Sequence, residues 1–319
     1  MDARPTSIRD LSLLFVATAL GTALATSVAA FGLPIAAAGI AGLAYRGRTI
    51  VAVAAAGVGI GIAAMSALVD LLYVAPVALA IILAVVLLPR RPVQFVAGLL
   101  VFVFALASVG YDAFVARAAG TTLPAQIAVQ AQLLAAELVK SMGSSAPSEM
   151  LGQLKEAATF VASSWPSAYF QSAVFLAVIV TAAIAWSARR SGVSLDIPPL
   201  SRLDITPHVM WAFVGGLLLL AASYGSFSAS ETFGVVGLNL VLCARTFFFL
   251  QGISVSAGVL DRTGVGLGGR ILALAALAAL DAFTLVLSFT GLLDFWINFR
   301  RLPRDGESPI AAEPSTRRW

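Results

Sequence analysis

Two charged side chains lie inside strongly apolar stretches, where burying a charge is energetically costly. Arg245 is near the middle of the apolar run 233–260, and Asp281 interrupts the apolar run 271–295. At the centre of a membrane helix, an Arg or Asp costs roughly 2.5–3.5 kcal/mol on insertion scales. Each of these side chains therefore needs a charged partner, water or a ligand.

Arg245 and Asp281 have more than one interpretation, and the sequence leaves the choice open. If their two helices pack antiparallel about a short turn, the charges differ in depth by only about 6 Å and form an ion pair. Alternatively, the Arg245 fork binds the carboxylate or phosphate of a small anionic solute. The amides of Asn239 and Gln251 would then add hydrogen bonds, although they lie on other faces of the same helix. A third interpretation is an interface with another membrane subunit.

The composition indicates that this chain is a membrane protein. Of the 319 residues, 60% are hydrophobic and 11% are charged, whereas a soluble domain carries about 25% charged residues. The net charge of +4 comes from arginines that mostly end apolar runs, where they set topology. We therefore predict an all-α, polytopic transmembrane helical bundle that contacts the lipid bilayer and binds no nucleic acid.

Patterns typical of soluble catalysis are absent from the sequence. Cys243 and His208 are the only residues of their types, so we expect neither a disulfide framework nor a metal site. The segment 264–269 matches GxGxxG, but it follows a membrane helix and is better interpreted as a turn between helices. A lipid-modifying enzyme would have only three carboxylates near its membrane segments: Asp112, Asp281 and Asp294. We expect no enzyme activity, no cofactor and no metal.

Hydropathy divides the chain into four parts. We expect an N-terminal transmembrane bundle over residues 1–114, an amphipathic interfacial insertion over 115–166, a C-terminal transmembrane bundle over 167–301 and a disordered tail over 302–319. The insertion holds two amphipathic helices, 126–140 and 149–161, that lie along the membrane surface. They act either as a connector or as a lid over a cavity.

The apolar runs predict about eight or nine crossings. They are 11–31, 35–45, a hairpin over 49–88, 93–114, 168–186, 209–224, 233–260 and 271–295. We expect turns at Gly32–Pro34 and between Asp70 and Pro76. With nine crossings and a cytoplasmic N-terminus, eleven arginines up to Arg270 lie inside and only Arg117 and two lysines lie outside, as the positive-inside rule expects. The five arginines from Arg300 onward fall outside and violate the rule.

Small residues recur at every fourth position of the first apolar run: Ala17, Gly21, Ala25 and Ala29. They lie on one helix face and let a neighbouring helix approach closely. That neighbour belongs either to this chain or to a partner membrane protein docked on the Ala17, Gly21 and Ala25 face.

Segments near the C-terminus resemble a known family. The run 239–252, with its Phe-Leu-Gln-Gly end, and the segment Gly291-Leu-Leu-Asp-Phe-Trp-Ile-Asn-Phe-Arg-Arg301 resemble the C-terminal signature of the YybS-like predicted membrane proteins of bacteria. The resemblance covers about 168–301. That family has no established activity and is distantly similar to the S components of energy-coupling-factor vitamin transporters. Those S components bind a small molecule within a helical bundle and dock on a shared energising subunit.

These observations predict a transporter-like component of a bacterial cytoplasmic membrane that binds a small solute and lacks its own energy source. Arg245 would contact an anionic group of that solute. The alternative is a non-enzymatic membrane scaffold or assembly factor, in which the Arg245–Asp281 pair is structural.

Overall fold

A computed structural model describes residues 8–142, 148–225, 229–300 and 302. Every regular element in these ranges is a helix, which confirms the predicted all-α class. Among them, six helices are long and apolar enough to cross a membrane, and three shorter helices are also apolar. Apart from Leu302, the predicted disordered tail lies outside the described residues, as does the linker 143–147 between the predicted amphipathic helices.

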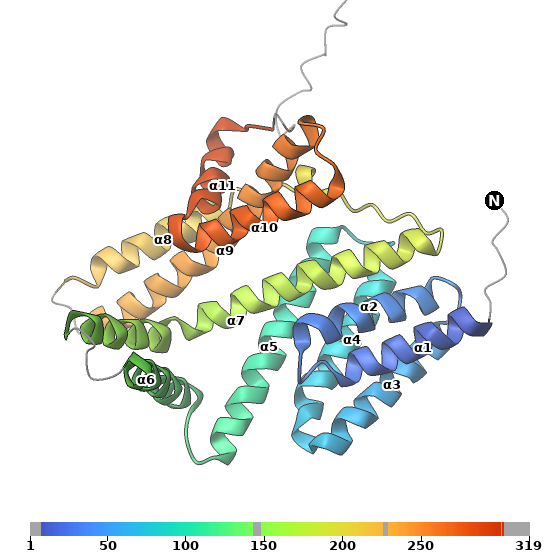
Figure 1. Ribbon diagram of the computed structural model, residues 1–319, viewed down its shortest axis with the longest axis horizontal. Helices are drawn as coiled ribbons and strands as arrows, with labels where there is room; N and C mark the ends of the chain where they lie inside the picture. Colours follow the sequence, from blue (N-terminus) through green and yellow to red (C-terminus); the bar gives the residue numbers. More distant parts are fainter. Residues whose placement is uncertain (1–7, 143–147, 226–228, 301, 303–319) are drawn as a thin grey trace, which may run out of the picture. The chain divides into compact units, whose positions relative to one another are not determined.

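Contacts between residues divide the chain into two compact units, Met1–Ile197 and Pro198–Trp319, which we call the N-unit and the C-unit. The helices of the N-unit are α1 (Ile8–Ala23), α2 (Ala29–Ala44), α3 (Thr49–Ser66), η1 (Leu68–Asp70), α4 (Leu71–Leu87), α5 (Val93–Ala118), α6 (Leu123–Met142) and α7 (Ser148–Arg190). Within this unit α2 is central, because it packs against α1, α3, α4 and α7 (Figure 1). The amphipathic helix α6 packs along the first part of α7.

The small residues of the first apolar run are used inside the chain. Gly21 and Ala25 are buried, and a Cβ on Gly21 would overlap the backbone of Ala36 in α2. In the same way, a Cβ on Gly59 of α3 would overlap the carbonyl oxygen of Ala19. The face that we considered for a partner protein is therefore occupied by this chain's own helices, which need small side chains to approach so closely.

Two turns lie elsewhere than the sequence predicted. The first connection occupies residues 24–28 rather than Gly32–Pro34, and both Gly32 and Pro34 are inside α2. Gly32 is small because of packing, since a Cβ there would come within 2.8 Å of the Gly21 carbonyl oxygen. The second hairpin turns at residues 67–70, and Pro76 is inside α4.

The helix α7 joins two segments that we predicted to be separate. It continues for 43 residues through Pro166, so the second amphipathic helix and the next membrane span are one element. The rings of Trp165 and Tyr169 pack edge to face on either side of the proline, with centroids 5.9 Å apart. At 1.5 Å per residue the helix is about 65 Å long, twice the thickness of a hydrocarbon core. The helix is therefore longer than a single crossing requires.

The C-unit is built around one long helix. Its elements are η2 (Leu200–Arg202), α8 (Val209–Ala222), α9 (Ser230–Arg262), α10 (Leu267–Thr284) and α11 (Val286–Ile297), with α8 and α11 packed on α9 (Figure 1). The prediction of a single helix over 271–295 is wrong, because Leu285 adopts a left-handed conformation (φ 57°) and separates α10 from α11. The Asp281 carboxylate stabilises this break by accepting hydrogen bonds from the Ser288 backbone N–H and hydroxyl, both at 2.9 Å.

The helices α10 and α11 form a hairpin beside α9. Contacts with α9 run in opposite directions along the two helices: Arg270–Asp261 then Asp281–Arg245 for α10, and Ser288–Arg245, Asp294–Gln251 then Arg300–Ser254 for α11. The chain therefore advances to about the middle of α9, reverses at Leu285 and returns. Close approach of α11 to α9 depends on glycine, since a Cβ on Gly291 would overlap the Phe248 carbonyl oxygen.

Candidate functional site

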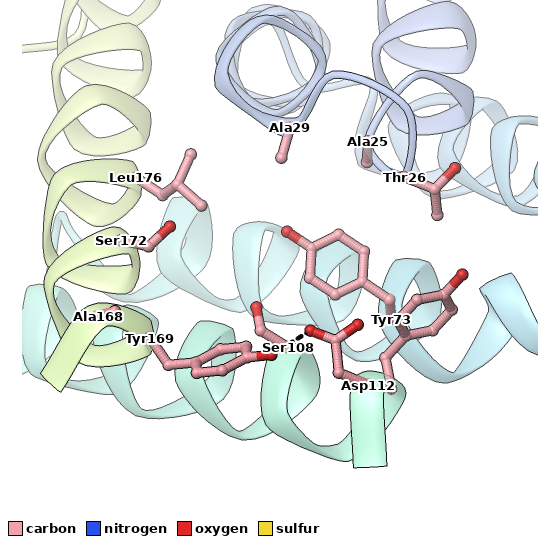
Figure 2. Close-up of a pocket in the computed structure, with 11 residues that line it drawn as sticks. Ala25, Thr26, Ala29, Tyr73, Ser108, Asp112, Ala168, Tyr169, Ser172 and Leu176 are labelled. Carbon is pink, nitrogen blue, oxygen red and sulfur yellow. Dashed lines mark hydrogen bonds between the residues drawn. The ribbon is translucent and has the colours of Figure 1, made fainter. Parts of the chain in front are cut away.

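A cavity of about 410 Å³ lies in the N-unit among the α1–α2 connection, α4, α5 and α7 (Figure 2). Its volume falls within the range of roughly 300–1,000 Å³ that small-molecule sites occupy. Most of its wall is apolar. Its polar side chains are Thr26, Tyr73, Ser108, Tyr111, Asp112, Tyr169 and Ser172.

Helical spacing places several of these side chains on the helix faces that line the cavity. Ser108 and Asp112 are one turn apart on α5, and Ser172 and Leu176 are one turn apart on α7, so each pair lies on one helix face. Figure 2 shows Ser172 and Leu176 pointing from α7 into the space that Asp112 lines from α5. An apolar pocket with a few converging polar groups is the usual form of a ligand site.

The carboxylates of this region have tyrosine partners. The Tyr169 hydroxyl donates a hydrogen bond to Asp112 Oδ2, and the Tyr111 hydroxyl donates to Asp70 Oδ1 at 3.1 Å. Asp70 is buried and Asp112 is half-buried. Within the described part of the chain, no Lys, Arg or His lies at ion-pair distance from either carboxylate. The negative charge of this region is therefore not neutralised by the described residues.

The Arg245–Asp281 region of the C-unit differs, because its charges meet each other. Arg245 Nη2 lies 3.4 Å from Asp281 Oδ2, with side chains that are 38% and 2% exposed respectively. The guanidinium also lies 3.5 Å from the Asp281 carbonyl oxygen and 3.5 Å from the Ser288 hydroxyl. A cation at the C-terminal end of α10 and a carboxylate at the N-terminal end of α11 both suit the helix dipoles.

The structure does not bring the other two predicted ligand-binding residues to Arg245. Gln251 is fully buried, and its Nε2 donates to Asp204 at 2.7 Å and to Asp294 at 2.9 Å. Asn239 donates to the Val235 carbonyl oxygen of its own helix at 2.8 Å. A shared solute site for Arg245, Asn239 and Gln251 stays a prediction, and their separate surroundings do not favour it.

A second buried ion cluster, which the sequence did not reveal, joins the end of α11 to the segment before α8. Arg300 is 4% exposed in its side chain, and its Nη2 lies 2.9 Å from Asp294 Oδ2 and 3.3 Å from Asp204 Oδ1. Its Nη1 donates to the Leu203 carbonyl oxygen at 2.7 Å. Because Asp204 and Arg300 are far apart in the sequence, no local spacing indicates this contact.

The cavity was only partly visible in the sequence. The sequence indicates Asp112 only as one of the three carboxylates that a lipid-modifying enzyme would have near its membrane segments. The chain has five tyrosines, and three of them line this cavity, namely Tyr73, Tyr111 and Tyr169. Because these tyrosines lie on three different helices, no local spacing in the sequence indicates that they meet. In the part of the chain that the structure describes, no cluster of three or more His, Cys, Asp or Glu side chains could hold a metal ion.

Comparison with protein families matches residues 11–295 to the family described as "Predicted membrane protein (DUF2232)". Neither the curated proteins nor the solved structures contain a match. Because the family match covers most of the sequence, the chain belongs to this family of predicted membrane proteins.

Proposed function

We propose that this member of the DUF2232 membrane protein family binds a small solute, without changing it chemically, in the cavity of its N-unit. The observation that carries the proposal is the cavity itself, in which hydroxyl groups and one carboxylate converge in a largely apolar wall. Ionisable residues inside membrane segments commonly mark substrate or ion pathways. In this proposal, the solute site is the region around Asp112, because Arg245 already has Asp281 as its partner.

A transporter-like role agrees with this location. The resemblance to YybS-like proteins, and more distantly to S components, implies a solute-binding subunit of a bacterial cytoplasmic membrane that docks on a separate energising partner. The Ala17, Gly21 and Ala25 face is packed within the chain, so such a partner would use another surface.

The distribution of arginine indicates the side from which a solute would enter. Successive helices of the N-unit alternate in direction, and basic residues follow the ends at one side: Arg46, Arg48, Arg90, Arg91, Arg189 and Arg190. The Arg190 guanidinium also lies 4.3 Å from the centre of the Trp186 ring, a pairing suited to a membrane interface. The cavity is formed by the opposite ends, including the α1–α2 connection and the start of α4. By the positive-inside rule, it faces away from the cytoplasm.

Native mass spectrometry of the protein gently extracted from its own host tests this function. We expect a small molecule to be released at fixed stoichiometry from the wild-type protein. Ser172→Phe, which fills the cavity from α7, should lose that molecule. Val178→Phe, at a 40%-exposed position of the same helix outside the cavity, should keep it. Equal retention by both variants would contradict the proposal. So would a wild-type protein that releases no bound molecule and binds no added solute.

A further inference from the structure

The charge of the cavity wall selects among classes of solute. Asp112 is the one ionisable acid on the wall, and the cavity-lining residues include no Lys, Arg or His. Asp70 carries a second negative charge near the wall, where its carboxylate accepts a hydrogen bond from the lining residue Tyr111. An anionic solute would meet repulsion here, whereas a cation would neutralise a carboxylate that the described residues leave without a basic partner.

The aromatic rings of the wall favour the same sign of charge. Tyr73, Tyr111 and Tyr169 all line the cavity, and the rings of Tyr73 and Tyr111 pack edge to face with centroids 6.3 Å apart. The face of an aromatic ring attracts a cation, and groups of aromatic side chains recognise ammonium ligands in this way. Three rings and one carboxylate in one cavity are therefore complementary to an ammonium group.

The size and oxygen supply of the cavity argue against a bare metal ion. Hard cations such as Ca²⁺ take about six to eight oxygen ligands, commonly from several carboxylates. Here the wall offers one carboxylate, and part of its surface is Ala and Leu. Alanine and leucine contacts, such as those with Ala25, Ala29 and Leu176, suit the carbon atoms of an organic molecule.

We propose that the N-unit cavity binds a small organic cation, a protonated amine or a quaternary ammonium compound, whose charge is held by Asp112 among Tyr73, Tyr111 and Tyr169. This inference rests on the proposed solute-binding function and specifies the class of solute. Tyr169 positions the carboxylate by donating to its Oδ2. Ser108 and Ser172 offer hydroxyl groups for any polar substituent of the ligand.

Isothermal titration of the purified full chain in detergent tests the charge preference. The probes are tetraethylammonium chloride and butylammonium chloride, compared with sodium butyrate and sodium chloride at equal ionic strength. We expect saturable binding of at least one ammonium probe and none of butyrate. Asp112→Asn should weaken that binding at least tenfold. Glu137→Gln, which removes an exposed carboxylate on α6, should leave the dissociation constant within twofold of the wild-type value.

A second pair of variants keeps the test decisive if Asp112→Asn does not fold. Ser172→Lys would place an ammonium group of the protein in the cavity, and it should abolish binding of the ammonium probes. Ser172→Met has a side chain of similar length without charge, and it should weaken binding much less. Equal effects of the two substitutions would overturn the role that we assign to charge.

The remaining outcomes separate this inference from the proposed function. Binding of butyrate, or of sodium ions in place of the ammonium probes, would overturn the organic cation. A host-derived molecule that is lost in Ser172→Phe but carries no cationic group would also overturn it, while solute binding would stand. Absence of both a host-derived molecule and probe binding in the folded wild-type protein would overturn both proposals.

Discussion

The carboxylates of the apolar helices have different partners in the two units of this protein. In the C-unit, Asp281 and Asp294 each have an arginine within 3.4 Å. In the N-unit, Asp70 and Asp112 receive hydrogen bonds from tyrosine hydroxyls, and no described basic residue pairs with them. The N-unit also contains the cavity of about 410 Å³ beside its unpaired charge. Charge is thus paired within the C-unit, whereas in the N-unit Asp112 lines the cavity and meets no described basic residue.

This difference has an energetic consequence. Breaking a buried ion pair by removing one partner leaves an uncompensated charge and is strongly destabilising. A carboxylate without a basic partner is already an uncompensated charge, so replacing it with a neutral side chain should change the free energy of unfolding little. Functional sites commonly retain such unfavourable groups because activity depends on them. Stability measurements can therefore distinguish the two units.

The largest effect is expected at the buried cluster of the C-unit. Arg300→Ala leaves Asp294, whose side chain is 0% exposed, without its cation and should lower the free energy of unfolding by about 3–5 kcal/mol. Arg270→Ala is the matched control, because its pair with Asp261 is exposed and contributes about 0–1 kcal/mol. Denaturant unfolding in detergent measures both, and similar losses in the two variants would contradict the structural role of the cluster.

A smaller loss is expected where α9 and α11 touch. A Cβ at position 291 would overlap the Phe248 carbonyl oxygen, so Gly291→Ala must push the two helices apart and should cost about 1–3 kcal/mol. Gly57→Ala is the control, since a Cβ on this exposed face of α3 meets nothing within 4 Å. That substitution should raise stability by roughly 0.5–1 kcal/mol, because alanine is the better helix former. If the thermal melting points of the two variants fell equally, the close approach of α11 to α9 would not be the cause of the loss at Gly291.

The Arg245–Asp281 pair should show an intermediate and asymmetric response. Asp281→Ala removes both the ion pair and the cap of α11, so we expect a loss of about 2 kcal/mol. Arg245→Ala should cost about 1 kcal/mol or less, because its side chain is 38% exposed and water screens the pair. The double variant should lose less than the sum of the two. A double-mutant cycle in thermal denaturation measures this coupling, and strict additivity would exclude a pair that contributes to stability.

The sequence predicted the helical class and most apolar segments because hydropathy depends only on local composition. It did not predict where the helices break. Gly32 and Pro34 are typical turn residues, yet Gly32 serves close packing inside α2. In contrast, Leu285 ends α10 although leucine favours helices, and the partner that stabilises the break is the Asp281 carboxylate. Such positions are set by contacts between elements, which local composition does not contain.

Local composition also failed to predict the topology near the C-terminus. Interpreting 271–295 as one crossing placed Arg300 and the residues after it on the side that the positive-inside rule disfavours. The hairpin of α10 and α11 instead returns Arg300 to the Ser201 and Leu203 carbonyl oxygens, in the segment before α8. The end of α11 therefore lies beside the segment that precedes α8. A reversal in the middle of an apolar run is not visible to hydropathy.

The smallest effect on stability is expected at the cavity, and it is the sharpest test of the contrast between the units. Asp112→Asn preserves the shape of the side chain and removes a charge that no described basic residue balances. In ligand-free protein we expect the free energy of unfolding to change by less than about 1 kcal/mol, in the stabilising direction, because burying a neutral amide in an apolar wall costs less than burying a carboxylate.

Asp294→Asn, made in parallel, should destabilise by several kcal/mol, since it removes the charge that pairs with buried Arg300. Thermal melts of both variants without ligand make the comparison. A loss at Asp112 as large as that at Asp294 would mean that its charge is structural as well, and the distinction between the two units would fail.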